Sequence, residues 1–173
     1  MTVLGTREGR SLVFTRTYAA PLDDVWAACT EPARLERWIG TWAGDPAAGE
    51  VRFRMTAEGD DVPEEVYDVE LCEPPRRFVL RSREAAPFSE DGSGPRVHWR
   101  HTLELDESDG LTTLRFTQAV PEGPTGAAMV ASVGPGWDYY LDRLTADLGG
   151  ADVAGIDFEP YLERSEHYRA LFG

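Results

Sequence analysis

The spacing of apolar residues changes once along the chain, and this change constrains the fold more than any other feature. Up to Val120, apolar and polar side chains alternate over several short segments, which is typical of β-strands. From Pro124 onward, apolar residues recur at every third or fourth position, which is typical of one face of a helix. The sequence therefore predicts a run of strands followed by a long helix.

The long helix should bury one apolar face. The residues of this face are Trp137, Tyr140, Leu141, Leu144 and Leu148. The sequence Gly134-Pro135-Gly136 predicts a kink or an interruption, because proline removes a helical hydrogen bond. An extra amphipathic segment is expected at the C-terminus, over about 157–172.

Six segments show the alternation expected of strands. They cover residues 11–18, 51–56, 67–71, 78–82, 97–105 and 114–120. Two short helices are expected after the first strand, and Pro21 suits the first turn of the earlier one. Residues 40–50 are expected to form a loop, and residues 85–95 a flexible connection rich in Gly, Pro and Ser.

This order of elements predicts an α+β fold. Strands joined by short connections pair antiparallel, and their apolar face needs a helix to cover it. We therefore expect a curved antiparallel sheet of about six strands wrapped around the long C-terminal helix, in a single domain over 1–173. The two short helices would close one end of the groove. Such an arrangement can leave a cavity between the helix and the sheet.

Four segments carry a resemblance to a known family. They are TYAAPLDDVW at 17–26 with the following TEP at 30–32 and LERW at 35–38, EPPRRF at 73–78, GWDYYLDRL at 136–144 and YRALFG at 168–173. Together they resemble the SRPBCC (START-related, helix-grip) superfamily, and within it the branch related to the C-terminal domain of the heat shock protein 90 ATPase activator. The resemblance covers nearly the whole chain. These are mostly core and turn residues, so they indicate the scaffold more than the chemistry.

The resemblance implies three functions, of which we favour the first. It implies a small-molecule binding protein with a hydrophobic or aromatic ligand in the cavity. It also implies a co-chaperone that stimulates the ATPase of heat shock protein 90, or an enzyme related to polyketide cyclases and hydrolases. We expect no counterpart here of the additional N-terminal domain that the activator carries, and docking onto an acidic chaperone is disfavoured by the charge of this chain.

The charge balance restricts the partners. The chain has 17 Lys and Arg residues against 31 Asp and Glu residues, a formal net charge of -14. A field of this sign repels nucleic-acid phosphates and anionic membrane surfaces. All the basic residues are Arg, so Schiff-base chemistry on a lysine is excluded.

Cysteine usage and the N-terminus indicate a reduced, cytoplasmic protein. Cys29 and Cys72 are far apart and form no metal-binding pair, so two reduced, mostly buried thiols are expected. Residues 1–10 carry no apolar leader, and no apolar run approaches the roughly 18 residues of a membrane span.

The histidines do not predict a metal site. His98 and His101 are three residues apart, so on a strand they would lie on opposite faces. No phosphate loop, dinucleotide fingerprint or nucleophile elbow is present, and we predict no cofactor and identify no catalytic residues.

His101 is the sharpest candidate for a polar group inside the cavity. It shares the parity of Trp99 and should point toward the helix. A lone inward histidine is more often a hydrogen-bonded core residue than a functional group, and its expected partner is Gln118 or a polar group of the ligand. The predicted cavity lining comprises Trp99, His101, Phe116, Gln118, Met129, Trp137 and Tyr140.

Overall fold

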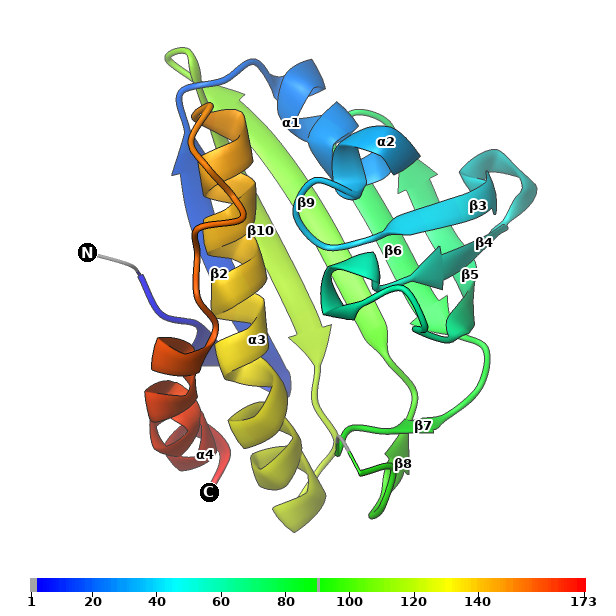
Figure 1. The fold of residues 1–173 in the computed structure, drawn as a ribbon, viewed down its shortest axis with the longest axis vertical. Coiled ribbons are helices and arrows are strands. Elements are labelled where there is room, and N and C mark those ends of the chain that lie inside the picture. The colour runs from blue at the N-terminus through cyan, green and yellow to red at the C-terminus, as the bar shows by residue number, and fades with distance from the viewer. Residues whose placement is uncertain (1–2, 90) are drawn as a thin grey trace.

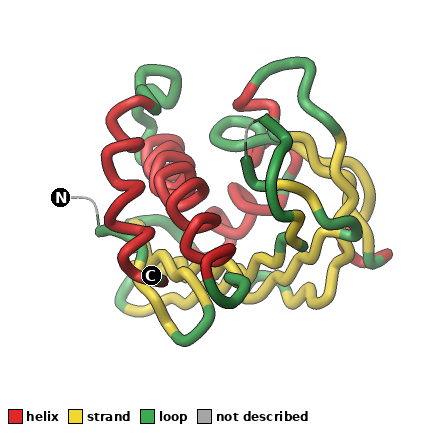
Figure 2. The backbone as a smooth tube through the Cα atoms, turned by 90° about the horizontal axis from the view of Figure 1, so that it is seen from below, coloured by secondary structure: helices red, strands yellow, loops and turns green. Residues whose placement is uncertain are grey.

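An antiparallel sheet of eight strands forms one layer of the molecule, and the helices lie on its concave side (Figures 1 and 2). The computed structural model describes residues 3–89 and 91–173. The strands of this sheet are β1 (Thr6–Glu8), β2 (Ser11–Tyr18), β3 (Thr41–Asp45), β4 (Glu50–Arg54), β5 (Glu64–Glu73), β6 (Arg77–Ser82), β9 (Arg100–Ser108) and β10 (Leu111–Ala119). Their order across the sheet is β1-β2-β10-β9-β6-β5-β4-β3. The predicted α+β architecture is confirmed, with two strands more than expected.

The helices follow the predicted order. They are α1 (Leu22–Thr30), α2 (Pro32–Leu35), α3 (Pro124–Leu148) and α4 (Ser165–Phe172), and a 3-10 helix, η3 (Glu159–Arg164), precedes α4. Figure 1 shows α3 running along the sheet, with α1 and α2 near one of its ends and α4 beside it on the outer side. No helix within residues 3–89 and 91–173 has both the length and the apolar character that crossing a membrane requires.

The strand register agrees with the predicted alternation. In β10 every second residue from Thr112 to Gln118 is buried, because this face lies under the helices. Leu103 pairs with Phe116 and His101 with Gln118 across the two strands. A shift of one residue would have turned the apolar set to solvent, so the shared apolar face fixes the register.

Two parts of the sheet were not predicted. The expected loop over 40–50 contains the edge strand β3 and a 3-10 turn, η1 (Pro46–Ala48). Trp42 is the one buried side chain of β3, so the strand has no alternation to detect. The other addition, β1, is three exposed residues long.

The connection expected over 85–95 also contains secondary structure. Its ends form a small two-stranded ribbon of β7 (Ala86–Pro87) and β8 (Arg96–Val97), while residue 90 of this connection lies outside the described residues. The single strand expected over 97–105 is divided into β8 and β9. At the break, the Trp99 amide donates to the Ser82 hydroxyl over 2.9 Å, in place of a backbone partner.

Helix α3 passes through the expected break without interruption. Gly134 and Pro135 are both buried inside a helix of 25 residues. The ring of Tyr168, from α4, lies directly against Gly134, where any Cβ would overlap it. Here tertiary packing outweighs the local preference, because the absence of a side chain at Gly134 lets α4 approach α3 closely.

Candidate ligand-binding pocket

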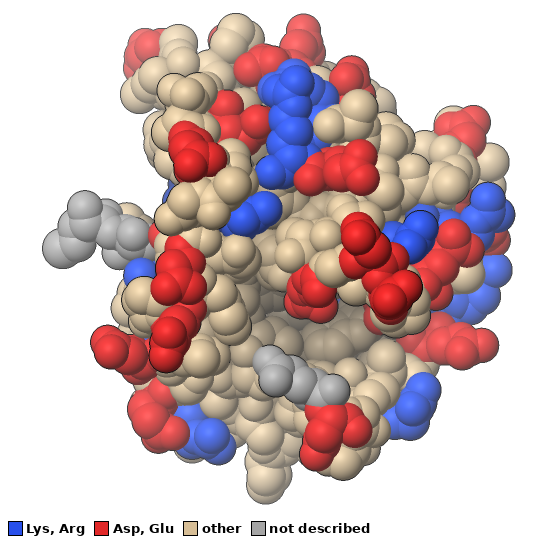
Figure 3. All heavy atoms as spheres, viewed as in Figure 1, with Lys and Arg blue, Asp and Glu red and all other residues tan. Residues whose placement is uncertain are grey.

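A pocket of about 710 Å³ lies between α3, the sheet and the α1–α2 end of the molecule. Figure 3 shows the corresponding hollow in the face that the pocket opens onto. Aromatic rings from β4, β5, β10, α3 and the break between β8 and β9 line it, and they belong to Phe53, Tyr67, Phe116, Trp137, Tyr140 and Trp99. The lining is mainly apolar and aromatic, as in pockets that bind small organic molecules.

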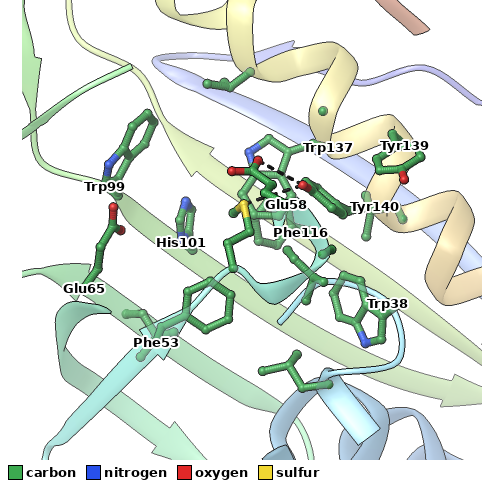
Figure 4. A pocket seen from close by; sticks show the side chains of 18 of the residues that line it. Trp38, Phe53, Glu58, Glu65, Trp99, His101, Phe116, Trp137, Tyr139 and Tyr140 are labelled. Atoms are coloured by element: carbon green, nitrogen blue, oxygen red, sulfur yellow. Dashed lines mark hydrogen bonds between the residues drawn. The ribbon is translucent and has the colours of Figure 1, made fainter. Parts of the chain in front are cut away.

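The structure brings five of the seven predicted lining residues into this pocket. They are Trp99, His101, Phe116, Trp137 and Tyr140 (Figure 4). The Trp137 ring lies 4.2 Å from that of Phe116 and 5.1 Å from that of His101, measured between ring centroids. The predicted inward direction of His101 is thereby confirmed.

Two predicted lining residues are wrong. Gln118 is fully buried and does not line the pocket, and its side chain bonds to the ring of His101 on the neighbouring strand and to the Ala119 carbonyl. Met129 is also fully buried, since the part of α3 that faces the pocket begins later, at Ser132. Both side chains pack in the core. Core and lining residues share the same strand parity and helical spacing, so these patterns alone cannot distinguish them.

His101 is held by a buried hydrogen bond. Its Nε2 lies 2.6 Å from Oε1 of Gln118, and Nε2 of Gln118 donates to the Ala119 carbonyl over 3.0 Å. This arrangement assigns the proton to Nε2 of His101 and leaves Nδ1 as an acceptor. Burial lowers the pKa of His101 to about 4, although the bond to Gln118 opposes the shift. The imidazole is therefore neutral near pH 7.

Two carboxylates that were not among the predicted lining residues also line the pocket. Glu58 follows β4 in a short 3-10 turn, η2 (Thr56–Glu58), and accepts a hydrogen bond from the Tyr140 hydroxyl over 3.0 Å. Glu65, on β5, accepts one from the Tyr67 hydroxyl over 3.0 Å. Burial raises the pKa of each tyrosine, and the neighbouring carboxylate raises it further. Both tyrosines therefore remain protonated donors.

Glu65 lies just before the strand expected over 67–71. It has the same parity as Tyr67, and it pairs with Phe53 of the neighbouring strand, whose ring also lines the pocket. Because β5 begins at Glu64, three residues earlier than expected, this parity applies to Glu65. No pattern in the sequence distinguishes Glu58 from the other exposed acidic residues that follow it.

Cys29 lies at the buried end of the pocket, and both cysteines are free thiols, as predicted. Burial raises the pKa of Cys29 to about 12, so this thiol stays protonated and unreactive. Ser82 is buried but does not line the pocket, and its hydroxyl instead donates to the Glu84 carbonyl over 2.8 Å.

The histidine arrangement offers no metal site in the described part of the chain. His98 is exposed, on the side opposite to His101, and its Nδ1 lies 3.1 Å from the Ser82 carbonyl oxygen. Among residues 3–89 and 91–173, no three His, Cys, Asp or Glu side chains are grouped so that they could hold a metal ion.

Solved structures with this arrangement of helix and sheet are numerous. CalU16 from Micromonospora echinospora is 30% identical, with a TM-score of 0.69, over 94% of this chain and 88% of that chain. The protein encoded by gene BPP1335 of Bordetella parapertussis is 22% identical, with a TM-score of 0.69, over 98% of this chain and 90% of that chain. DynU16, from the dynemicin biosynthetic locus, is 23% identical, with a TM-score of 0.58, over 84% of this chain and 50% of that chain.

The family comparison agrees with the motifs in the sequence. No curated protein matches the chain. The family model described as "Activator of Hsp90 ATPase homolog 1-like protein" matches residues 19–149, which include α1, α2, the strands from β3 to β10, and α3. The chain therefore belongs to the family of Activator of Hsp90 ATPase homolog 1-like proteins, with the helix-grip fold of the SRPBCC superfamily.

Proposed function

We propose that the protein binds a small, ring-containing apolar molecule in the pocket between α3 and the sheet. The observation that carries this proposal is the pocket itself, with a volume of about 710 Å³ and an aromatic lining. Ligand pockets in proteins typically have volumes of roughly 300–1,000 Å³ and combine apolar walls with a few polar groups. Here the polar groups are His101, Glu58 and Glu65.

A ring inserted between the sheet and α3 would contact the aromatic cluster directly. Trp137 forms the centre of that cluster, and its centroid lies 6.4 Å from that of Tyr140 in addition to the contacts with Phe116 and His101. Trp137 is only partly buried, so part of its ring faces the pocket. A bound ring would cover this exposed part.

Titration with 1-naphthylmethanol, followed by isothermal calorimetry and tryptophan fluorescence, tests the proposal. We expect saturable binding, weakened at least about tenfold by Trp137→Leu. Trp26→Leu is the matched control, because Trp26 is partly buried in α1 and packs on Phe78 without lining the pocket. Absence of binding, or equal losses in the two folded variants, would contradict the proposal.

The family match favours a second candidate, stimulation of a chaperone ATPase. The net charge of -14 opposes docking onto an acidic chaperone surface. An ATPase assay with the cognate heat shock protein 90 separates the two candidates. Clear stimulation by this protein alone would place chaperone activation ahead of ligand binding.

A further inference from the structure

The charged groups among the described lining residues are of one sign. Glu58 and Glu65 line the pocket, and no Arg does so. Glu58 is exposed, whereas Glu65 is half-buried and forms no ion pair with any described residue, unlike the half-buried Asp24, whose Oδ1 lies 2.9 Å from Nη1 of Arg34. The pocket therefore presents negative charge beside an aromatic wall.

The two carboxylates are oriented by buried tyrosines. Tyr67 and Tyr140 are 6% and 8% exposed, and each donates its hydroxyl proton to one carboxylate. Figure 4 shows the Glu65 carboxylate pointing toward Trp99, with His101 drawn between Glu65 and Glu58. Each glutamate keeps a second carboxylate oxygen to which these tyrosines donate no hydrogen bond.

The surrounding groups favour a cation over an anion. Aromatic faces attract cations, and the carboxylate of Glu65, which is half-buried, interacts more strongly with an opposite charge than the exposed carboxylate of Glu58 does. His101 is neutral, and its Nδ1 can accept a hydrogen bond but cannot supply a positive charge. Burial is the main cause of the raised pKa values of Tyr67 and Tyr140, and the neighbouring carboxylate raises each pKa further.

We infer that the pocket selects ring-containing molecules that carry a protonated amine, with the ring against Trp99, Phe116 and Trp137 and the ammonium group between Glu58 and Glu65. This inference rests on the proposed function and names the ligand class for the same pocket. The ammonium group donates to the glutamate oxygens and to Nδ1 of His101. An acidic ligand of the same shape is repelled.

Three probes that share the naphthalene ring and differ in the charge of its substituent test this inference: 1-naphthylmethylamine, 1-naphthylmethanol and 1-naphthoate. Isothermal calorimetry at pH 7.5 gives their dissociation constants. We expect the amine to bind at least about tenfold more tightly than the alcohol, which corresponds to about 1.4 kcal/mol. The naphthoate should bind more weakly than the alcohol.

Neutral isosteres of the two glutamates locate the source of this preference. Glu65→Gln and Glu58→Gln keep an acceptor for the tyrosine hydroxyls, so we expect both variants to fold. Each should reduce the amine-to-alcohol preference at least about threefold. Glu64→Gln is the matched control, because Glu64 is exposed on the other face of β5, with its Oε1 3.5 Å from Nε of Arg52.

Each outcome decides between the two proposals. If the alcohol binds and the amine binds no more tightly, the charge selectivity is wrong while the ligand-binding function stands. If Glu64→Gln lowers the preference as much as Glu65→Gln, the overall charge of -14 explains it and the inference is overturned. If none of the three probes binds, both proposals fail.

Discussion

His101 and Gln118 show how one buried polar pair connects the core to the pocket. Gln118 is 0% exposed, and its amide is satisfied by His101 on one side and by the Ala119 carbonyl on the other. His101 presents its remaining nitrogen toward the pocket. His101 is therefore both a hydrogen-bonded core residue and a polar group of the pocket lining, so these two roles do not exclude each other.

Replacement of His101 should cost stability through Gln118. In His101→Phe, Oε1 of Gln118 loses its donor in a buried site, and leaving a buried acceptor unsatisfied costs about 1–3 kcal/mol. His101→Phe/Gln118→Leu removes both polar partners, so its loss in urea unfolding should be about 1 kcal/mol smaller than the sum of the single variants. Strict additivity of the two losses would show that the hydrogen bond is not coupled in this way.

The same pair makes a pH-dependent contribution to stability. The pKa of His101 is about 4 in the folded protein, below its ordinary value of 6.5, so between these values the unfolded chain binds more protons. Unfolding then becomes more favourable as the pH falls, and the loss between pH 7.5 and pH 5 should be about 2 kcal/mol. The free energy of unfolding of His101→Phe/Gln118→Leu should fall less than that of the wild type over this range. An equal fall in both proteins would show that His101 is not responsible.

At the scale of secondary-structure elements, the contact between α3 and α4 explains why α3 is continuous. Gly134 accommodates the ring of Tyr168, whereas at Gly136, two residues further along, an added Cβ would meet no atom within 4 Å. The two glycines have the same intrinsic helix preference, so only the packing distinguishes them. They form a matched pair for testing the contact.

Gly134→Ala and Gly136→Ala should change stability in opposite directions. At Gly134 the new methyl group overlaps the Tyr168 ring, and overpacking of this kind costs about 1–3 kcal/mol. At Gly136 the methyl group is free of contacts, and alanine should stabilise the helix by about 0.5–1 kcal/mol. Thermal unfolding followed by circular dichroism measures both, and a stabilised Gly134→Ala would mean that α4 does not pack closely on α3.

At the scale of the whole molecule, a buried aspartate ties the two ends of the chain to the long helix. Asp138 of α3 is 0% exposed, its Oδ1 accepts from Arg16 of β2 over 3.1 Å, and Nη1 of Arg164 lies 3.0 Å from its Oδ2. Tyr168 donates its hydroxyl proton to Asp138 and accepts from the Gly5 amide over 3.0 Å. Segments from both termini thus meet at one carboxylate on the side of α3 away from the pocket.

Asp138→Asn should destabilise the whole fold. Removing one partner of a buried ion pair typically costs 3–5 kcal/mol, because the other charges remain buried without compensation. Glu166→Gln is the control, since its ion pair with Arg169 on α4 is exposed and should contribute about 0.5 kcal/mol at most. Urea unfolding measures both, and similar small losses would mean that the network does not hold the termini.

The sequence by itself determined the order of elements, the strand register and the family. All three can be predicted from patterns within short segments of the chain. The alternation in a strand and the spacing in a helix depend only on which side of that one element is buried. The same parity predicted His101 as an inward residue with Gln118 as its partner.

Only the tertiary structure decided which inward residues reach the pocket. Met129 and Trp137 lie on the same helix, and their distance from the hollow depends on where the sheet curves away from α3. Likewise, Glu58 lines the pocket where η2 meets Tyr140 of α3, a contact between segments far apart in sequence, and Glu65 lines it from β5. The periodicity of apolar residues predicts which side of an element is buried, but not which element packs against that side. It therefore could not predict that these two carboxylates line the pocket and give it its negative charge.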